Sequence, residues 1–134
     1  RPDGLILCYP VISAGEFAHR GSFENLVGGQ TRALSEKLSQ PVMELLSLEN
    51  QVGAHTPPAF IWHTFADDAV PVENSLLFAG ALRRAGVAAE FHLYPRGGHG
   101  LSLATWLTAN RDGAGVQEEC ASWISLAHTW IEHQ

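Results

Sequence analysis

The clearest pattern of apolar and polar positions lies in residues 57–101. Residues 59–65 form a short apolar run, with Pro57 and Pro58 before it and Asp67 and Asp68 after it. Such a run, bounded by turn-forming residues on both sides, is typical of a buried strand. A second run of strand-like composition follows at residues 89–94. The segment therefore predicts two strands joined by a longer connection.

That connection has the pattern of a helix between Pro71 and Gly86. Proline suits the first turn of a helix, where its missing N–H costs nothing, and glycine supplies the left-handed position that ends one. Between them, apolar residues recur at helical spacing on one expected face: Val72, Leu76, Ala79 and Leu82. The strand at residues 89–94 then leads into the turn at residues 97–100. This order predicts a βαβ unit, whose two strands run parallel and end at the same edge of a sheet.

The remaining elements extend this unit on both sides. Residues 4–12 are almost continuously apolar, as in a parallel strand covered on both faces. Residues 13–56 are more polar and favour three short helices: one capped by Ser22 and running to Leu26, one capped by Thr31, and one opened by Pro41. A final helix is expected from apolar positions on one face: Val116, Cys120, Trp123, Ile124, Ala127 and Ile131. The sequence thus predicts an α/β fold, with three parallel strands at about 4–12, 59–65 and 89–94 and flanking helices.

Composition narrows the classes of function. The chain has 134 residues, is 46% hydrophobic and carries a formal charge of -6, so residues 1–134 have the size of a single domain. It contains no apolar run of about 18 residues, which excludes a membrane span. The negative charge and the lack of any lysine and arginine cluster argue against nucleic acid as a partner. Neither the two cysteines nor the seven histidines have metal-ligand spacing, so no metal or cofactor is expected.

Two ionisable residues follow the ends of the parallel strands. Asp67 comes after residues 59–65 and His99 after residues 89–94, so we expect their side chains to be neighbours. A carboxylate beside an imidazole fixes the tautomer of the ring and stabilises the imidazolium that forms when it takes a proton. The pair is therefore a candidate general base for a nucleophile. Asp68 is an alternative acid, whereas His63 and His92 lie inside strands and are interpreted as structural histidines.

These segments resemble a known family. Asp67-x-x-Val70-Pro71 after one strand and Gly98-His99-Gly100 after the next are similar to the acid and histidine segments of α/β-hydrolase-fold esterases, in the acetyl-xylan-esterase-like and small carboxylesterase branch. In that fold the triad follows the chain order Ser, Asp or Glu, His. The resemblance implies that the chain is the C-terminal portion of such a sheet, a single partial domain with a helical, cap-like insert at residues 13–56. It also implies Asp67 as triad acid, in preference to Asp68, and His99 as base.

The same resemblance implies a serine hydrolase of short acyl esters, acetyl esters and esters of carbohydrates among them. The sequence has no Gly-x-Ser-x-Gly segment, so the nucleophile and the oxyanion hole are expected on a missing N-terminal half, and this chain alone is expected to be inactive. The expected partners are a small-molecule ester, that N-terminal half and, as a further possibility, a second copy at the bare edge of residues 4–12. A non-catalytic hydrolase-like scaffold and a prolyl-oligopeptidase-type peptidase segment are the alternatives. Localisation stays open, with the cytoplasm favoured over secretion.

Overall fold

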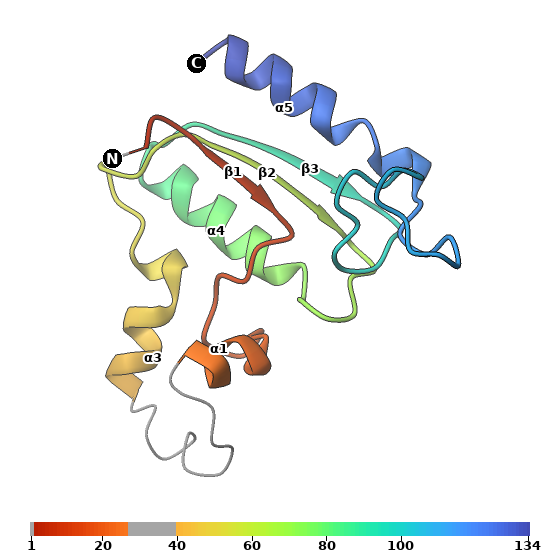
Figure 1. The fold of residues 1–134 in the computed structure, drawn as a ribbon. Coiled ribbons are helices and arrows are strands. Elements are labelled where there is room, and N and C mark those ends of the chain that lie inside the picture. The colour runs from red at the N-terminus through yellow and green to blue at the C-terminus, as the bar shows by residue number, and fades with distance from the viewer. Residues whose placement is uncertain (1, 27–39) are drawn as a thin grey trace.

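The computed structural model describes residues 2–26 and 40–134, and its centre is a three-stranded parallel sheet (Figure 1). The strands β1 (Leu5–Cys8), β2 (Ala59–Thr64) and β3 (Ala89–Tyr94) lie in the order β1-β2-β3. All six residues of the central strand β2 are buried. The three predicted parallel strands are confirmed. The first is shorter than residues 4–12, because the chain turns at Tyr9, which has a φ of 38°.

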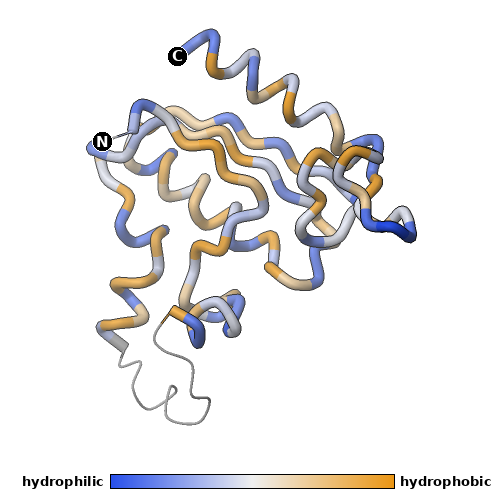
Figure 2. Tube along the Cα trace, viewed as in Figure 1, coloured by the Kyte–Doolittle hydropathy of each residue, from blue (hydrophilic) through white to orange (hydrophobic). Residues whose placement is uncertain are grey.

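Helices cover both faces of the sheet (Figure 1). α4 (Glu73–Arg84) joins β2 to β3 and packs on one face, and α5 (Trp123–Glu132) lies on the other. Successive side chains of a strand point to opposite faces. Accordingly Phe60 and Trp62 pack with the tryptophans of α5, and Ile61 packs with Phe78 and Leu82 of α4. Figure 2 shows the continuous hydrophobic stretch of β1 at the edge of this core.

The expected apolar face of α4 is exposed at one position, Leu76, although Val72 and Leu82 are buried. Leu76 is 45% exposed, whereas Asn74 and Ser75 are completely buried beside Phe78. The prediction of Leu76 as a core residue is therefore wrong. Asn74 and Ser75 are buried because their side chains have hydrogen-bond partners beneath the helix, in the chain after β1 and in β2.

The C-terminal helix also begins later than its apolar pattern indicates. A 3-10 turn, η2 (Glu118–Cys120), precedes α5, so the apolar positions do not share one continuous helix. The buried residues of α5 are Trp123, Ala127 and Trp130, while Ile124 and Ile131 are exposed. The larger indole rings fill the space above β2, and this packing sets the buried face of the helix.

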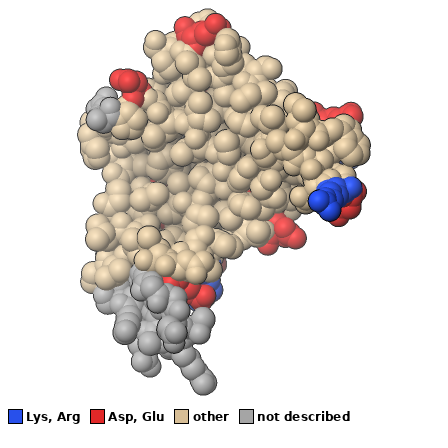
Figure 3. Space-filling model, in the orientation of Figure 1, with Lys and Arg blue, Asp and Glu red and all other residues tan. Residues whose placement is uncertain are grey.

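Residues 13–56 contain short helices, of which the structure describes α1 (Arg20–Leu26), α3 (Gln40–Leu46) and the 3-10 helix η1 (Leu48–Asn50). Ser22 does not begin α1; it lies in the first turn, where its hydroxyl bonds the ring of His19. The helix expected from Thr31 lies outside the described residues. The face drawn in Figure 3 is largely uncharged, with acidic groups scattered over its margins. None of the helices in residues 2–26 and 40–134 is long and apolar enough to cross a membrane.

Candidate active site

Asp67 lies in the turn that directly follows β2, and its carboxylate is fully buried. One oxygen, Oδ1, accepts the backbone N–H groups of Ala69 at 3.0 Å and Val70 at 2.9 Å. Aspartate commonly bonds the backbone two or three residues ahead in this way, which stabilises a tight turn. The local sequence therefore fixes the carboxylate and leaves its second oxygen for contacts with other parts of the chain.

His99 reaches that second oxygen from the loop after β3. Its Nδ1 lies 2.8 Å from Asp67 Oδ2, although the two residues are 32 positions apart. The His99 side chain is 34% exposed, so one side of the pair is buried and the other is accessible. Because the carboxylate can only accept, Nδ1 carries the hydrogen and the neutral ring keeps its lone pair at Nε2. This is the arrangement that a general base needs.

The alternative acid does not take part in this contact. Asp68 is exposed, and the oxygen that binds the His99 ring belongs to Asp67. The structure thus brings Asp67 and His99 together, as the topology predicts, and leaves Asp68 at the surface. The catalytic roles of Asp67 and His99 stay predictions.

The loop that carries His99 is tied to the end of β2. Thr64 Oγ1 donates a hydrogen bond of 2.8 Å to the carbonyl oxygen of Gly97. Gly97 has a φ of 120°, and a Cβ at this position would lie 2.8 Å from Leu101 Cδ1 and 3.0 Å from Thr64 Cγ2. Only glycine adopts this conformation without strain or collision. The glycine therefore sets the path of the loop, two residues before the imidazole.

Tyr9, at the end of β1, packs against the other side of the His99 ring. The two ring centroids are 4.8 Å apart at an interplanar angle of 71°, and Tyr9 makes a similar edge contact with Trp62 at 5.0 Å. The Tyr9 hydroxyl accepts the backbone N–H of Ser102 at 3.2 Å. The sequence reasoning missed this residue. Its only signal is an aromatic residue placed where an apolar run ends before a proline.

His63 lies on the buried side of the acid. Its Nε2 is 3.2 Å from Asp67 Oδ2 and 3.1 Å from the carbonyl oxygen of Val70, and its Nδ1 is 2.8 Å from Ser75 Oγ. Burial lowers the pKa of His63, and this effect outweighs the opposing contacts to Val70 and Asp67. The interpretation of His63 as a hydrogen-bonded histidine agrees with these contacts. Its proximity to the acid was not foreseen.

The charge state of Asp67 follows from the same surroundings. Burial raises the pKa of Asp67, but the bonds from the N–H groups of Val70 and Ala69 and from the His99 ring outweigh it, so the pKa lies below its ordinary value. The acid is therefore ionised at neutral pH, and the buried His63 beside it is neutral.

Asn74 is a second residue that the sequence reasoning missed. Its Oδ1 accepts the backbone N–H groups of Ile12 and Ser13, each at 2.9 Å, and its Nδ2 donates to the carbonyl oxygens of Phe17 and Pro71, each at 2.9 Å. The amide thus ties the start of α4 to the chain that follows β1. The available signal was a polar residue close to the start of a helix that packs on a sheet.

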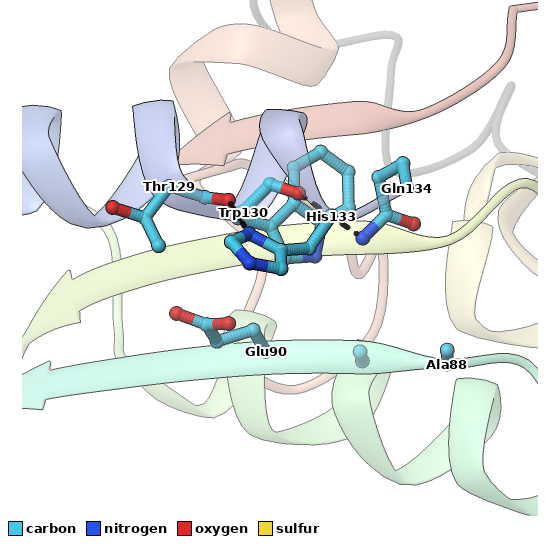
Figure 4. A pocket seen from close by; sticks show the side chains of 7 residues that line it. Ala88, Glu90, Thr129, Trp130, His133 and Gln134 are labelled. Atoms are coloured by element: carbon cyan, nitrogen blue, oxygen red, sulfur yellow. Dashed lines mark hydrogen bonds between the residues drawn. The ribbon is translucent and has the colours of Figure 1, made fainter.

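Metal ligands and hollows were sought around this site among residues 2–26 and 40–134. The described part of the chain contains no group of three His, Cys, Asp or Glu residues that could hold a metal ion. A hollow of about 390 Å³ lies between the start of β3 and the end of α5 (Figure 4). Its lining includes Glu90, Trp130 and His133. It is at the opposite end of β3 from His99, so it is separate from the Asp67–His99 pair.

Comparison with known proteins agrees with the fold and the pattern of residues. The prolyl oligopeptidase family matches residues 26–125, which is more than half of the chain. Endo-1,4-beta-xylanase B of Butyrivibrio fibrisolvens is 47% identical over 104 residues, covering 78% of this chain and 15% of that protein.

Solved structures of hydrolases match nearly the whole chain. An acetyl ester-xyloside bifunctional hydrolase from Caldicellulosiruptor lactoaceticus is 44% identical with a TM-score of 0.82, over 99% of this chain and 43% of that one. A carboxylesterase from Lactobacillus plantarum is 29% identical with a TM-score of 0.79, over 100% of this chain and 45% of that one. The chain therefore spans less than half the length of these relatives. It belongs to the prolyl oligopeptidase family and has part of the α/β-hydrolase fold that the esterases of this comparison share.

Proposed function

We propose that this chain supplies the acid and the base of a serine carboxylic-ester hydrolase. The observation that carries the proposal is the 2.8 Å contact between the buried Oδ2 of Asp67 and Nδ1 of the partly exposed His99. Both residues follow parallel strands and lie at the carboxyl edge of the sheet, where ligands bind in α/β folds. The similarity to an acetyl ester-xyloside hydrolase and to a carboxylesterase supports the same chemistry.

The reaction follows from the properties of these groups. A serine hydroxyl is a weak nucleophile at neutral pH, so His99 Nε2 takes its proton as the serine oxygen attacks the ester carbonyl. The Asp67 carboxylate stabilises the imidazolium that forms. His99 then gives this proton to the departing alcohol as the tetrahedral adduct collapses to an acyl-enzyme. Water, deprotonated by the same ring, releases the acid and regenerates the serine. These steps require no metal and no cofactor.

We place the serine and the oxyanion donors on a segment outside the given sequence. The sequence contains no Gly-x-Ser-x-Gly, and the similar hydrolases are more than twice as long as this chain. The outer edge of β1 is the proposed site of contact, because within residues 2–26 and 40–134 β1 pairs only with β2 and leaves a row of backbone groups open. A second copy of the chain could occupy the same edge. Backbone N–H donors on the added segment would each stabilise the oxyanion by about 3 kcal/mol.

We propose short acyl esters as substrates, with acetyl groups on xylose-containing carbohydrates first among them. The basis is the similarity, at 44% identity, to an acetyl ester-xyloside bifunctional hydrolase. The family name supports a competing function, hydrolysis of peptide bonds after proline. The two functions share the acid and the base. They differ in the bond that is cleaved, so parallel assays on an acetylated xylo-oligosaccharide and on a prolyl peptide distinguish them.

The test uses the full-length gene product and a fluorophosphonate probe that labels activated serines. We expect labelling, acetyl-ester hydrolysis and a loss of kcat of about 10⁴-fold in Asp67→Asn and His99→Ala. Asp68→Asn is the matched control, because Asp68 is exposed beside the acid, and it should retain activity. Wild-type turnover in His99→Ala would refute the role of the base. A protein that takes no label and cleaves no ester would be a scaffold.

A further inference from the structure

The buried carboxylate of Asp67 has four hydrogen-bond contacts, and one of them comes from a second histidine. Oδ1 accepts two backbone N–H groups, and Oδ2 lies 2.8 Å from His99 Nδ1 and 3.2 Å from His63 Nε2. A carboxylate has about four acceptor sites, so all of them are used. His63 is fully buried inside β2, so it is unlike the exposed base and has no access to a substrate.

The chemistry of the neighbouring atoms determines the tautomer of His63. Its Nε2 faces two acceptors that cannot donate, the Asp67 carboxylate and the Val70 carbonyl, so Nε2 must carry a hydrogen. The remaining nitrogen of the neutral ring is then an acceptor, and the hydroxyl of Ser75 donates to it across 2.8 Å. The lowered pKa of His63, caused by burial, agrees with a neutral ring.

We propose that His63 is a positioning residue for the acid and base pair: its Nε2–H holds Asp67 Oδ2 in the place from which that oxygen binds His99. Ser75 has a supporting role, because its hydroxyl donates to Nδ1 and holds the ring in the orientation that presents Nε2–H to the acid. The catalytic meaning of this arrangement rests on the proposed function. The arrangement itself is a property of this chain.

The contact also extends to the turn that carries the acid. Because the same Nε2–H lies 3.1 Å from the Val70 carbonyl, one group fixes both the carboxylate and the last residue of its turn. The chain of contacts runs from Ser75 in α4, through His63 in β2 and Asp67 in the turn, to His99 in the loop after β3. Among the described residues, the charged or titratable groups of this chain of contacts are Asp67 and the two imidazoles, and α4 adds only the uncharged hydroxyl.

The experiment follows both rings by nitrogen NMR on this chain labelled with ¹⁵N-histidine, since imidazole nitrogens with and without hydrogen differ widely in shift. We expect His63 as a single Nε2–H tautomer and His99 as a single Nδ1–H tautomer. His63→Leu removes the donor, so the His99 signals should shift toward the mixture of tautomers of a free ring. His63→Gln offers an amide N–H near the position of Nε2 and should restore the single tautomer. His92→Leu, in the neighbouring strand, is the control and should leave His99 unchanged.

A folded His63→Leu variant with an unchanged His99 tautomer would overturn the proposal and leave His63 as a packing residue. If that variant does not fold, the spectrum of the unmodified chain decides: a hydrogen on His63 Nε2 supports the proposal, and a hydrogen on Nδ1 alone leaves the acid without this donor and refutes it. No nucleophile is needed for these measurements. The NMR measurement can therefore confirm the positioning of the pair even if the esterase function is refuted. The activity assays can likewise confirm the esterase function even if the positioning role of His63 is refuted.

Discussion

The side chain of Asn74 allows a quantitative test of how α4 is fixed to the chain after β1. It is completely buried, and its amide makes four hydrogen bonds of 2.9 Å, accepting from Ile12 and Ser13 and donating to Phe17 and Pro71. Asn74→Ala removes all four bonds and leaves two N–H groups and two carbonyls without this partner. A hydrogen bond contributes about 1 kcal/mol net, so we expect the free energy of unfolding to fall by about 3–5 kcal/mol.

Urea unfolding followed by tryptophan fluorescence measures this loss. With a urea slope of about 2 kcal/mol per molar, the midpoint should fall by about 2 M. Such a loss is a large share of the roughly 5–15 kcal/mol that stabilises a typical domain. Asn50→Ala is the matched control, because Asn50 is exposed in η1, and its midpoint should stay near that of the unmodified chain. A midpoint for Asn74→Ala equal to that of the control would refute the reasoning that these bonds fix the two segments together.

Two further predictions concern the loops around the acid and base pair. Gly97→Ala places a Cβ 2.8 Å from Leu101 Cδ1 at a φ of 120°. We therefore expect the free energy of unfolding to fall by about 2 kcal/mol or more, measured by the same urea titration. Gly98→Ala is the control, because a Cβ at that position meets no atom within 4 Å. The pH dependence follows from two lowered pKa values. In the folded chain the pKa of His63 lies below its ordinary value of 6.5, and the pKa of Asp67 lies below its ordinary value of 3.8. The neutral His63 ring and the ionised Asp67 carboxylate therefore stabilise the fold at pH values above their ordinary pKa values. This stabilisation is lost as the pH falls toward the lowered pKa that each group has in the folded chain. Urea midpoints should decrease first below about pH 6.5 and again near pH 4. A first decrease that is just as large in His63→Gln would contradict the assignment to His63.

The parallel strands and the acid and base pair could be predicted because their signals are local. Residues 59–65 are an apolar run bounded by turn-forming residues, residues 89–94 have strand-like composition, and a βαβ connection places the ends of two such strands at one edge. Asp67 and His99 are ionisable residues close to those ends, and the structure places Asp67 Oδ2 and His99 Nδ1 2.8 Å apart. The prediction therefore needed only the direction of the strands and the positions where they end.

The supporting residues could not be predicted in the same way, because their partners are decided by tertiary packing. Asn74 and Ser75 belong to a helix whose apolar spacing favoured Leu76 for the core, and they are buried because backbone groups after β1 and the ring of His63 lie beneath them. The sequence alone does not show that these groups lie close together in the folded chain. Tyr9 is a similar case, since its positive φ and its contact with His99 depend on the turn at the end of β1.

The contacts of His99 also indicate where the proposed nucleophile would enter. The residue follows β3, yet its ring binds Asp67 after β2 and packs on Tyr9 at the end of β1, so it reaches across the sheet toward the open edge of β1. Neighbouring parallel strands are about 4.8 Å apart and end at the same edge. A strand added beside β1 would therefore end within reach of the imidazole, whereas a strand added beside β3 would end on the far side of the acid. This geometry is the physical reason for placing the proposed serine after a strand that pairs with β1.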